Sequence, residues 1–257
     1  MSSMKTIFIS GAASGIGKAT AIFFADKGWY VGLYDIDETG LQRLHAQIGE
    51  KQSCWSSLDV SDRDSVEQAI SHFAAHTQGR MDVLFNNAGI LRVGFFDKLG
   101  MDEQAKTVDV NLKGVMYCTY AALPWLKKTK GARIVSMSSA SSVYGTAHMA
   151  AYSATKAAVS SLTESLNLEL EGCGIHVSDI RVPYVHTPLL ETKTKAASLE
   201  TMGAKLSPED VAAMVYASLE SMAVHYEGKG MLPLLMLRRF APMMIQKAVL
   251  KYIMMPR

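Results

Sequence analysis

Short apolar segments alternate with longer helical segments along most of the chain, and this alternation constrains the fold more than any other feature. The apolar segments are predicted strands, at residues 5–10, 30–34, 53–58, 81–85, 132–137 and 175–180, with residues 230–235 expected as a seventh. The predicted helices lie at residues 18–27, 38–49, 62–78, 101–128, 152–170 and 208–223. Strands joined by crossover helices form a parallel sheet with helices on both faces.

This pattern predicts an α/β protein with a single-domain, doubly wound Rossmann fold and a parallel sheet of about seven strands. We expect a catalytic domain over residues 1–237, with a loop over the substrate at about 188–206. Residues 238–257 form a basic, apolar C-terminal tail. The chain of 257 residues is long enough for a large core, and no linker or repeat divides it.

The composition excludes several classes of protein. Hydrophobic residues make up 49% of the chain and charged residues 19%, which is typical of a packed domain and not of a disordered one. A net charge of +2 is too small to indicate nucleic-acid binding. The three cysteines are scattered, so they exclude a disulfide scaffold and fit a reducing compartment: Cys54, Cys118 and Cys173.

Two further absences are expected from the sequence. Residues 1–5 lead directly into the first strand and no run of about 18 apolar residues follows, so we expect a cytoplasmic protein without a signal peptide or a spanning helix. His72 and His76 are four residues apart on a predicted helix, but the sequence places no third ligand near them. We therefore expect no metal site.

A glycine-rich turn follows the first predicted strand. Residues 11–17 read GAASGIG and open a predicted helix. Gly11 and Gly15 allow a tight turn and a close approach of the backbone to a pyrophosphate, while Gly17 allows the helix to pack closely. Because the free N–H groups and the dipole of a helix N-terminus favour an anion, this turn predicts a phosphate-binding site.

Asp35 ends the second predicted strand, where a carboxylate can reach the adenosine ribose of a dinucleotide. It can accept hydrogen bonds from the ribose hydroxyls, and it would repel a 2′-phosphate. A basic side chain at position 14 or 36 could bind such a phosphate, but these residues are Ser14 and Ile36. The sequence therefore favours NAD over NADP.

Tyr152 and Lys156 share one face of a predicted helix. A nearby ammonium stabilises a phenolate, so we expect Lys156 to lower the pKa of Tyr152 towards neutral pH. Ser139 follows the fifth predicted strand, at the carboxyl edge of the sheet where open α/β folds bind ligands. Ser138 is the alternative to Ser139 if the loop register differs.

Taken in order, these motifs resemble the classical short-chain dehydrogenase/reductase family from Ser10 to about Leu235. The resemblance rests on SGAASGIG at 10–17, Asp35, LDV at 58–60, NNAG at 86–89, Asn111, Ser139, Tyr152 and Lys156. It implies hydride transfer between a nicotinamide ring and a carbonyl or alcohol carbon.

The resemblance also implies a role for each residue. Tyr152 is the expected general acid/base, Lys156 lowers its pKa and holds the nicotinamide ribose, and Ser139 orients the reacting oxygen. Asn111 is expected to perturb its helix and to hold a water that links Lys156 to solvent. The expected cofactor-binding residues are Gly11, Ser14, Gly15, Ile16, Gly17, Asp35, Ile36, Asp59, Val60, Asn87, Ala88, Gly89, Tyr152, Lys156 and Thr187.

Two departures from the family pattern stand out. Ser10 replaces the usual threonine, a mild change because the hydroxyl remains. Val182-Pro183 stands where the family has Pro-Gly, and proline has no N–H and cannot adopt a glycine-only conformation. We therefore expect a different backbone path near the nicotinamide, although Thr187 could still bind the carboxamide.

The substrate side carries weaker signals. Position alone makes six residues candidates for contact with the substrate, and each could equally be a packing residue. They are Val143, Tyr144, His148, Met149, Leu189 and Leu190.

The tail is the most individual feature of the sequence. No acidic residue follows Glu227, but six basic ones do: Lys229, Arg238, Arg239, Lys247, Lys251 and Arg257. If residues 240–255 are helical, the two lysines occupy one narrow stripe and the remaining surface is almost wholly apolar. Such a tail could pack across the interface of a homo-oligomer, cover the active site as a methionine-rich wall for a greasy substrate, or lie on an anionic membrane surface.

We therefore expect an NAD-dependent oxidoreductase that acts on a secondary alcohol or ketone, with a hydrophobic substrate and without a nucleic-acid partner. Homo-oligomerisation is also expected. Two alternatives remain open: an NADP-linked acyl-chain ketoreductase, and a non-catalytic cofactor-binding sensor of the same fold.

Overall fold

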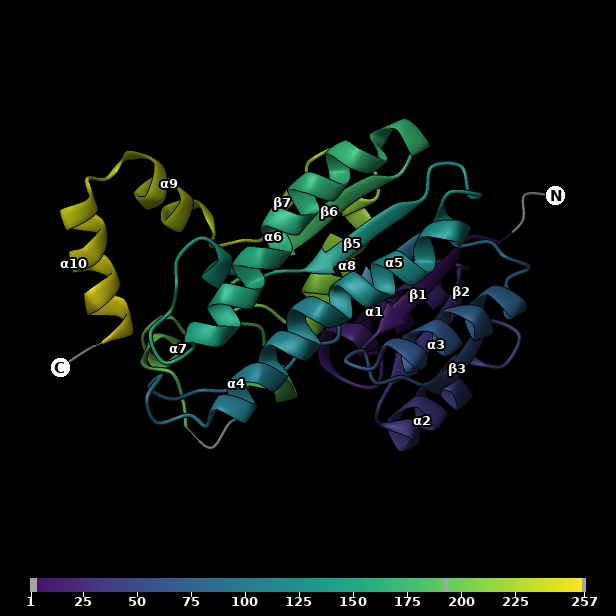
Figure 1. The fold of residues 1–257 in the computed structure, drawn as a ribbon, viewed down its shortest axis with the longest axis horizontal. Coiled ribbons are helices and arrows are strands. Elements are labelled where there is room, and N and C mark those ends of the chain that lie inside the picture. Colours follow the sequence, from purple (N-terminus) through teal and green to yellow (C-terminus); the bar gives the residue numbers. More distant parts are fainter. Residues whose placement is uncertain (1–3, 192–193, 256–257) are drawn as a thin grey trace.

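The computed structural model describes residues 4–191 and 194–255, and it contains one parallel sheet with helices on both faces (Figure 1). The sheet has seven strands in the order β3-β2-β1-β4-β5-β6-β7. The strands are β1 (Thr6–Ser10), β2 (Tyr30–Asp35), β3 (Ser53–Ser57), β4 (Val83–Asn86), β5 (Arg133–Met137), β6 (His176–Arg181) and β7 (His225–Glu227). The strand order reverses between β1 and β4, so the predicted doubly wound fold is confirmed.

Helices connect the strands and continue beyond the sheet. The α-helices are α1 (Gly15–Asp26), α2 (Glu38–Ile48), α3 (Arg63–His76), α4 (Met101–Val108), α5 (Gly114–Leu126), α6 (Ala150–Leu170), α7 (Ala197–Met202), α8 (Pro208–Ser218), α9 (Leu232–Phe240) and α10 (Met243–Met254). The short helical turns are η1 (Asp109–Lys113), η2 (Ala140–Ser142), η3 (Glu171–Cys173) and η4 (Pro188–Leu190).

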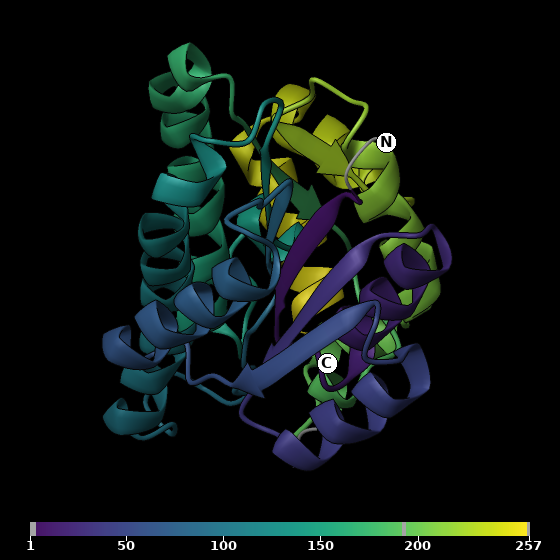
Figure 2. The same cartoon turned by 90° about the vertical axis from the view of Figure 1, so that its right-hand side faces the viewer.

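The two faces of the sheet form two apolar cores, because successive side chains of a strand point to opposite sides. Ile7 and Ile9 of β1 pack with residues of α1, α2 and α8 on one face. Phe8, which lies between them, packs with residues of α3, α5 and the end of α6 on the other face. Figure 2 shows these two helical layers on either side of the sheet.

The prediction of a strand at residues 230–235 is wrong. Those residues lead into α9, and the seventh strand is the earlier segment β7, which pairs in parallel with the end of β6. Pro233 lies in the first turn of α9, where its missing N–H would have had no intrahelical partner. The helix predicted at 101–128 is also divided, because the π-turn η1 separates α4 from α5.

The tail helices α9 and α10 lie at one end of the molecule, with α10 beside α7 and far from α2 and α3 (Figure 1). The predicted domain boundary at residue 237 falls within α9. Neither tail helix has a fully buried residue. In the described ranges, no helix is both long and apolar enough to cross a membrane. Arg257 and residues 192–193 of the predicted substrate loop lie outside the described residues.

Candidate active site

The glycine turn folds into a cradle at the N-terminus of α1. Gly11 and Gly15 have φ angles of +69° and +51°, a region that residues with side chains rarely adopt. A Cβ on Gly17 would collide with the carbonyl oxygen of Gly11. The Ser14 side chain makes no capping hydrogen bond, and the first turn of α1 contains no acidic residue. The first N–H groups of α1 can therefore receive an anion, which fits the pyrophosphate of a dinucleotide.

Asp35 is fixed beside this cradle by two backbone hydrogen bonds. Its Oδ2 accepts from the N–H of Ala13 at 3.0 Å, and its Oδ1 accepts from the N–H of Asp37 at 3.1 Å. A carboxylate has about four lone-pair sites, so Asp35 can still accept hydrogen bonds from a ribose.

Asp59 and Val60 follow β3 on the same side of the cavity. Asp59 accepts from the N–H of Ser61 at 2.8 Å, and its carboxylate lies 3.5 Å from the Lys106 ammonium. Partial burial opposes the charge, but the hydrogen bonds from Ser61 and the attraction of Lys106 prevail and lower the pKa of Asp59. Val60 packs on Gly114 of α5 and supplies an apolar wall.

The loop after β4 is tied to the glycine turn. The Ser10 hydroxyl accepts from the N–H groups of Asn87 and Ala88 at 3.1 and 3.2 Å. The Asn87 side-chain amide donates to the carbonyl oxygen of Gly11 at 2.9 Å. Ser10 thus uses its hydroxyl to join β1 to the loop that carries Asn87, Ala88 and Gly89.

Asn111 lies in the π-turn η1 and is fully buried. Its Oδ1 accepts from the N–H of Ile90 at 2.8 Å, and its Nδ2 donates to the carbonyl oxygen of Ile90 at 2.9 Å. Asn111 therefore fixes the backbone of Ile90, the residue after Gly89, through two hydrogen bonds. That it also holds a water linked to Lys156 stays a prediction.

Ser139, Tyr152 and Lys156 meet at the centre of the site. Ser139 and Tyr152 line the same cavity, and the Ser139 hydroxyl is close enough to favour the charged form of the Tyr152 phenol. The Lys156 ammonium donates to the carbonyl oxygen of Met137 at 2.7 Å and lies 5.7 Å from the centre of the Tyr152 ring. These contacts bring the end of β5 and the start of α6 together around the Tyr152 phenol.

Ser138 has a different environment from Ser139. Its hydroxyl bonds the Ser160 hydroxyl at 2.9 Å and donates to the carbonyl oxygen of Lys156 at 3.2 Å. Both partners belong to α6, so Ser138 fastens the helix to the strand. The structure places the Ser139 hydroxyl, and not that of Ser138, against Tyr152.

Burial dominates the titration of the two central groups. It raises the pKa of Tyr152 to about 12, although the hydrogen bond with Ser139 opposes this shift. It lowers the pKa of Lys156 to about 8, although the attraction of Asp179 opposes that shift. The expectation that Lys156 lowers the pKa of Tyr152 is therefore wrong for this arrangement. The reason is that burial desolvates the phenol, while the Lys156 ammonium bonds the Met137 carbonyl instead.

The departure at Val182-Pro183 lies beside these groups. The carbonyl oxygen of Val182 accepts from the N–H of Ala140 at 2.8 Å, which keeps the segment joined to the end of β5. Thr187 lies over the glycine turn, since a Cβ on Gly15 would come within 3.2 Å of the Thr187 methyl. An altered backbone path near the nicotinamide stays a prediction.

These elements enclose a cavity of about 570 Å³. All the expected cofactor-binding residues line it except Gly17, which is buried behind the turn. Ser139 also lines the cavity, whereas Asn111 does not. Among the substrate candidates, Tyr144, Met149, Leu189 and Leu190 line it, but Val143 and His148 do not.

The far wall of the cavity comes from the tail. Leu234 of α9 and Leu250, Ile253 and Met254 of α10 face it. Covering the active site was one of the three roles that the sequence analysis left open for the tail. No pattern along the chain identified these four side chains. The sequence also missed Tyr184, which lines the cavity and bonds the Ser198 hydroxyl at 2.6 Å.

Known proteins share this arrangement of strands, helices and motifs. The family profile described as short chain dehydrogenase matches residues 5–198. The chain belongs to the short-chain dehydrogenase/reductase family. The family's named relatives are reductases and dehydrogenases that act on alcohol or keto groups, and this protein is an oxidoreductase of that family. The matched residues end before the tail.

Two curated relatives illustrate the range of the family. The 3-oxoacyl-(acyl-carrier-protein) reductase FabG of Thermotoga maritima is 33% identical over 221 residues, 82% of this chain and 88% of that protein. The meso-2,3-butanediol dehydrogenase of Serratia marcescens is 32% identical over 216 residues, 82% of this chain and 85% of that protein.

Two solved structures share the fold. The 3-ketoacyl-(acyl-carrier-protein) reductase of Brucella melitensis, complexed with NADH, aligns with a TM-score of 0.78 and 29% identity, over 87% of this chain and 96% of that one. A short-chain dehydrogenase/reductase of Burkholderia phymatum, complexed with NAD, aligns with a TM-score of 0.79 and 26% identity, over 87% and 88% of the two chains. The family's nicotinamide cofactor therefore fits this chain's glycine cradle.

Proposed function

We propose that the protein is an NAD-dependent oxidoreductase that interconverts a hydrophobic secondary alcohol and its ketone. The observation that carries this proposal is that Asp35, Ser139, Tyr152 and Lys156 all line one cavity, which four apolar side chains of α9 and α10 also line. A bound nicotinamide would supply or accept the hydride, and its oxidised ring would add a positive charge that favours the phenolate of Tyr152.

The residues of the chain handle the proton and the reacting oxygen. In ketone reduction the Tyr152 phenol donates its proton to the developing alkoxide, and in alcohol oxidation the phenolate takes the hydroxyl proton. The Ser139 hydroxyl, which lines the cavity with Tyr152, holds the reacting oxygen in line. Lys156 contributes a charge close to the phenolate.

The choice of NAD rests on Asp35. Its carboxylate is fixed at the cradle by Ala13 and Asp37 and carries spare lone pairs for the ribose hydroxyls. A 2′-phosphate at the same place would meet this negative charge, and neither Ser14 nor Ile36 would compensate it. An NADP-linked acyl-chain ketoreductase is the alternative. Two of the similar proteins are named as ketoacyl reductases, and the solved one is complexed with NADH.

The hydrophobic substrate is supported by the tail. Four apolar side chains of α9 and α10 line the cavity opposite the catalytic residues. Two of them are Leu250, which is branched once, and Met254, which is long and unbranched. Such side chains can adapt to an alkyl chain.

The test is turnover with a series of secondary alcohols of rising chain length, with NAD and NADP compared. We expect NADH formation with kcat/KM rising with chain length, and Tyr152→Phe to lower kcat by about a thousandfold. Tyr184→Phe is the matched control, because this phenol lines the same cavity and bonds Ser198. Preference for NADPH and for ketoacyl thioesters would favour the alternative instead.

A change at Asp35 tests the cofactor separately. Asp35→Asn should weaken NADH binding by about tenfold or more, because a hydrogen bond to a charged group contributes about 1.5–3 kcal/mol. It should also narrow the ratio of NADPH to NADH dissociation constants, measured by fluorescence titration. An unchanged ratio would contradict the role of Asp35.

We further propose that the outward face of the tail lies on an anionic membrane. Eight large apolar side chains of this segment are exposed: Leu232, Met236, Phe240, Met243, Met244, Ile245, Tyr252 and Met255. Basic residues and no acidic ones accompany them, and each basic residue near an anionic surface contributes about 1 kcal/mol. The inner face of the same helices would then lie between the lipid and the catalytic residues.

Flotation with vesicles tests this contact. We expect the full chain to float with vesicles rich in phosphatidylglycerol and not with phosphatidylcholine alone. Changing Arg238, Arg239, Lys247 and Lys251 to glutamine should abolish flotation. Concentration-dependent dimers that are lost with the tail, and no flotation, would show that a second copy covers this face instead.

Homo-oligomerisation is proposed through a different surface. Met116 and Tyr120 of α5 and Leu168 of α6 are exposed on the same helical layer (Figure 2). A self-complementary patch of this kind suits a two-fold interface. In light scattering, we expect the wild type to be an oligomer and Tyr120→Glu to be a smaller species. A monomeric wild type would contradict this interface.

A further inference from the structure

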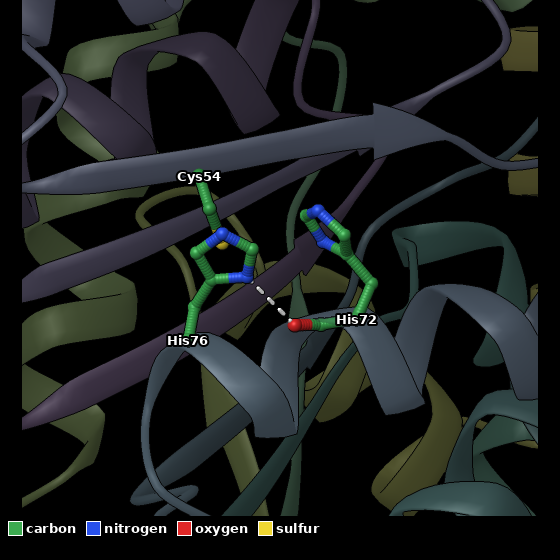
Figure 3. A group of neighbouring side chains, drawn as sticks. All are labelled: Cys54, His72 and His76. Atoms are coloured by element: carbon green, nitrogen blue, oxygen red, sulfur yellow. Dashed lines mark hydrogen bonds between the residues drawn. The ribbon is translucent and has the colours of Figure 1, made fainter.

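The edge strand β3 and helix α3 bring together three side chains that the cofactor site does not use. Cys54 lies on β3, and His72 and His76 lie one turn apart on α3 (Figure 3). One ligand atom of each residue lies within 4.8 Å of the other two. The sequence supplied the two histidines but no third ligand near them, and the packing of α3 on β3 now provides it.

We propose that Cys54, His72 and His76 bind a transition-metal ion of the Zn²⁺ class. One thiolate and two imidazoles are a donor set that selects zinc or copper over magnesium or calcium, which prefer oxygen ligands. With typical Zn–S and Zn–N bond lengths, the donor atoms of a tetrahedral site lie about 3.3–3.7 Å apart. Separations of up to 4.8 Å must therefore shrink by at most about 1.5 Å to close the site, and His76 is exposed and able to move.

The Nδ1 atoms of both histidine rings are already placed against oxygens. The Nδ1 of His72 lies 2.9 Å from the Tyr34 hydroxyl, and the Nδ1 of His76 lies 2.9 Å from the carbonyl oxygen of His72 (Figure 3). Metal-binding histidines almost always donate one ring N–H to an oxygen and use the other nitrogen for the metal. Within the described residues, the Nε2 of neither ring makes a hydrogen bond, so both remain available.

The cysteine is supported by the same network. The Tyr34 hydroxyl lies 3.7 Å from the Cys54 sulfur, so it can accept from His72 and donate to a thiolate. Cys54 is buried under the cluster, which shields a metal–sulfur bond from solvent. A hydrogen-bonded cluster without metal would also explain the Tyr34 contacts, and a cobalt titration distinguishes the two.

A small cavity gives the ion a path and a fourth ligand. It has a volume of about 230 Å³ and opens to solvent beside His76. Its lining residues are Tyr30, His45, Glu50, Ser53, Cys54, Trp55, His72 and His76. A water or the Glu50 carboxylate could complete four-coordination. The bound ion would clamp α3 to β3, the edge strand that continues to Asp59 and Val60.

Cobalt is the optical probe for this site. Tag-free, chelator-treated full-length protein is titrated with Co²⁺, followed by competition with Zn²⁺. We expect one Co²⁺ per chain with the visible bands of a tetrahedral ion and a thiolate-to-cobalt charge-transfer band, both lost when Zn²⁺ is added. Zn²⁺ should also raise the Tm of the protein, because it binds the folded state.

Variants decide between this site and adventitious binding. Cys54→Ser should remove the charge-transfer band, and His76→Ala should weaken Co²⁺ binding at least tenfold and abolish the Tm rise. His45→Ala is the matched control, because His45 lines the same cavity but its Nδ1 bonds the Ser53 hydroxyl at 2.8 Å. Cys173→Ser controls for the exposed thiol.

The proposal does not depend on the catalytic site, so NADH binding should persist in every variant. His76 is exposed, and its replacement therefore tests the site even if Cys54→Ser fails to fold. A wild-type spectrum without the charge-transfer band, or equal Co²⁺ affinity in wild type and His76→Ala, would overturn the proposal.

Discussion

The two walls of the central cavity are built in different ways. The cofactor wall is held by backbone hydrogen bonds at fixed positions, such as those of Asp35 with Ala13 and of Asn87 with Gly11. The tail wall has no fully buried residue, and one side-chain hydrogen bond, from Tyr144 to Gln246 at 3.1 Å, links it to the loop before α6. The Arg238 guanidinium also lies 5.4 Å from the centre of the Tyr144 ring.

This difference matches what each wall has to recognise. A pyrophosphate and a ribose present polar groups at fixed spacing, so their wall needs donors and acceptors in fixed places. An alkyl chain presents only area, which apolar side chains can cover in several arrangements. We therefore expect the cofactor wall to fail after a single small change, and the tail wall to respond in proportion to the area lost.

The largest effect should come from one methyl group in the cofactor wall. The new Cβ of Gly17→Ala would collide with the Gly11 carbonyl, and overpacking of this kind costs about 1–3 kcal/mol. We expect the free energy of unfolding to fall by that amount and NADH binding to weaken at least tenfold. Urea denaturation and fluorescence titration measure these two quantities.

Gly172→Ala is the control for this change, because its Cβ would meet nothing within 4 Å. It should alter neither stability nor NADH binding. If Gly17→Ala binds NADH as tightly as the wild type does, the cradle tolerates an added methyl group, and the cofactor wall is not more sensitive than the tail wall.

The tail wall should show a graded effect of intermediate size. Each methylene buried contributes about 0.8 kcal/mol, so kcat/KM should rise up to about fourfold per added methylene of the substrate. Deleting residues 243–257 removes Leu250, Ile253 and Met254 from the wall and should flatten this dependence, while short alcohols react as before.

Single changes in α10 sharpen this test. Leu250→Ser faces the cavity and should reduce the chain-length dependence. Met244→Ser is its matched control, because Met244 is 85% exposed and does not line the cavity. Equal kinetics of the two variants would mean that the tail does not touch the substrate.

The same difference explains what the sequence could predict. The glycine turn and Asp35 depend on residues close together in the chain and on backbone conformation, so their pattern is visible in the sequence. The apolar run at 230–235 is too short to separate strand from helix by periodicity, and its assignment as a strand was wrong. Pro233 was the available signal for a helix start.

Contacts between distant segments were beyond the sequence. Leu250 and Met254 reach the cavity only because α10 packs on α7, and Cys54 meets His72 only because α3 packs on β3. The direction of the Tyr152 pKa shift also needed the fold, because burial of the phenol raises this pKa. No pattern along the chain shows how deeply the phenol is buried.

The smallest effect concerns the charge at the junction of the two walls. Burial lowers the pKa of Lys156 to about 8, whereas an unfolded lysine has a pKa of about 10.4. Between these values the unfolded chain binds a proton that the folded protein has lost, so the free energy of unfolding should rise with pH. Lys156 should contribute a gain of about 1 kcal/mol between pH 8 and pH 9, measured as the difference between wild type and Lys156→Met. The difference is the quantity to measure, because burial raises the pKa of Cys54 and of Cys118, and these thiols oppose the trend equally in both proteins.

Tyr152 does not obscure this range, because its raised pKa of about 12 opposes the trend only above the pKa of an unfolded tyrosine, about 10. Lys247→Met controls for the loss of any lysine, because Lys247 is exposed on the tail. Urea denaturation at several pH values between 7.5 and 9.5 measures the difference. Parallel curves for wild type and Lys156→Met would mean that the ammonium keeps its water, and the junction would then resemble the open tail wall more than the tightly packed cofactor wall.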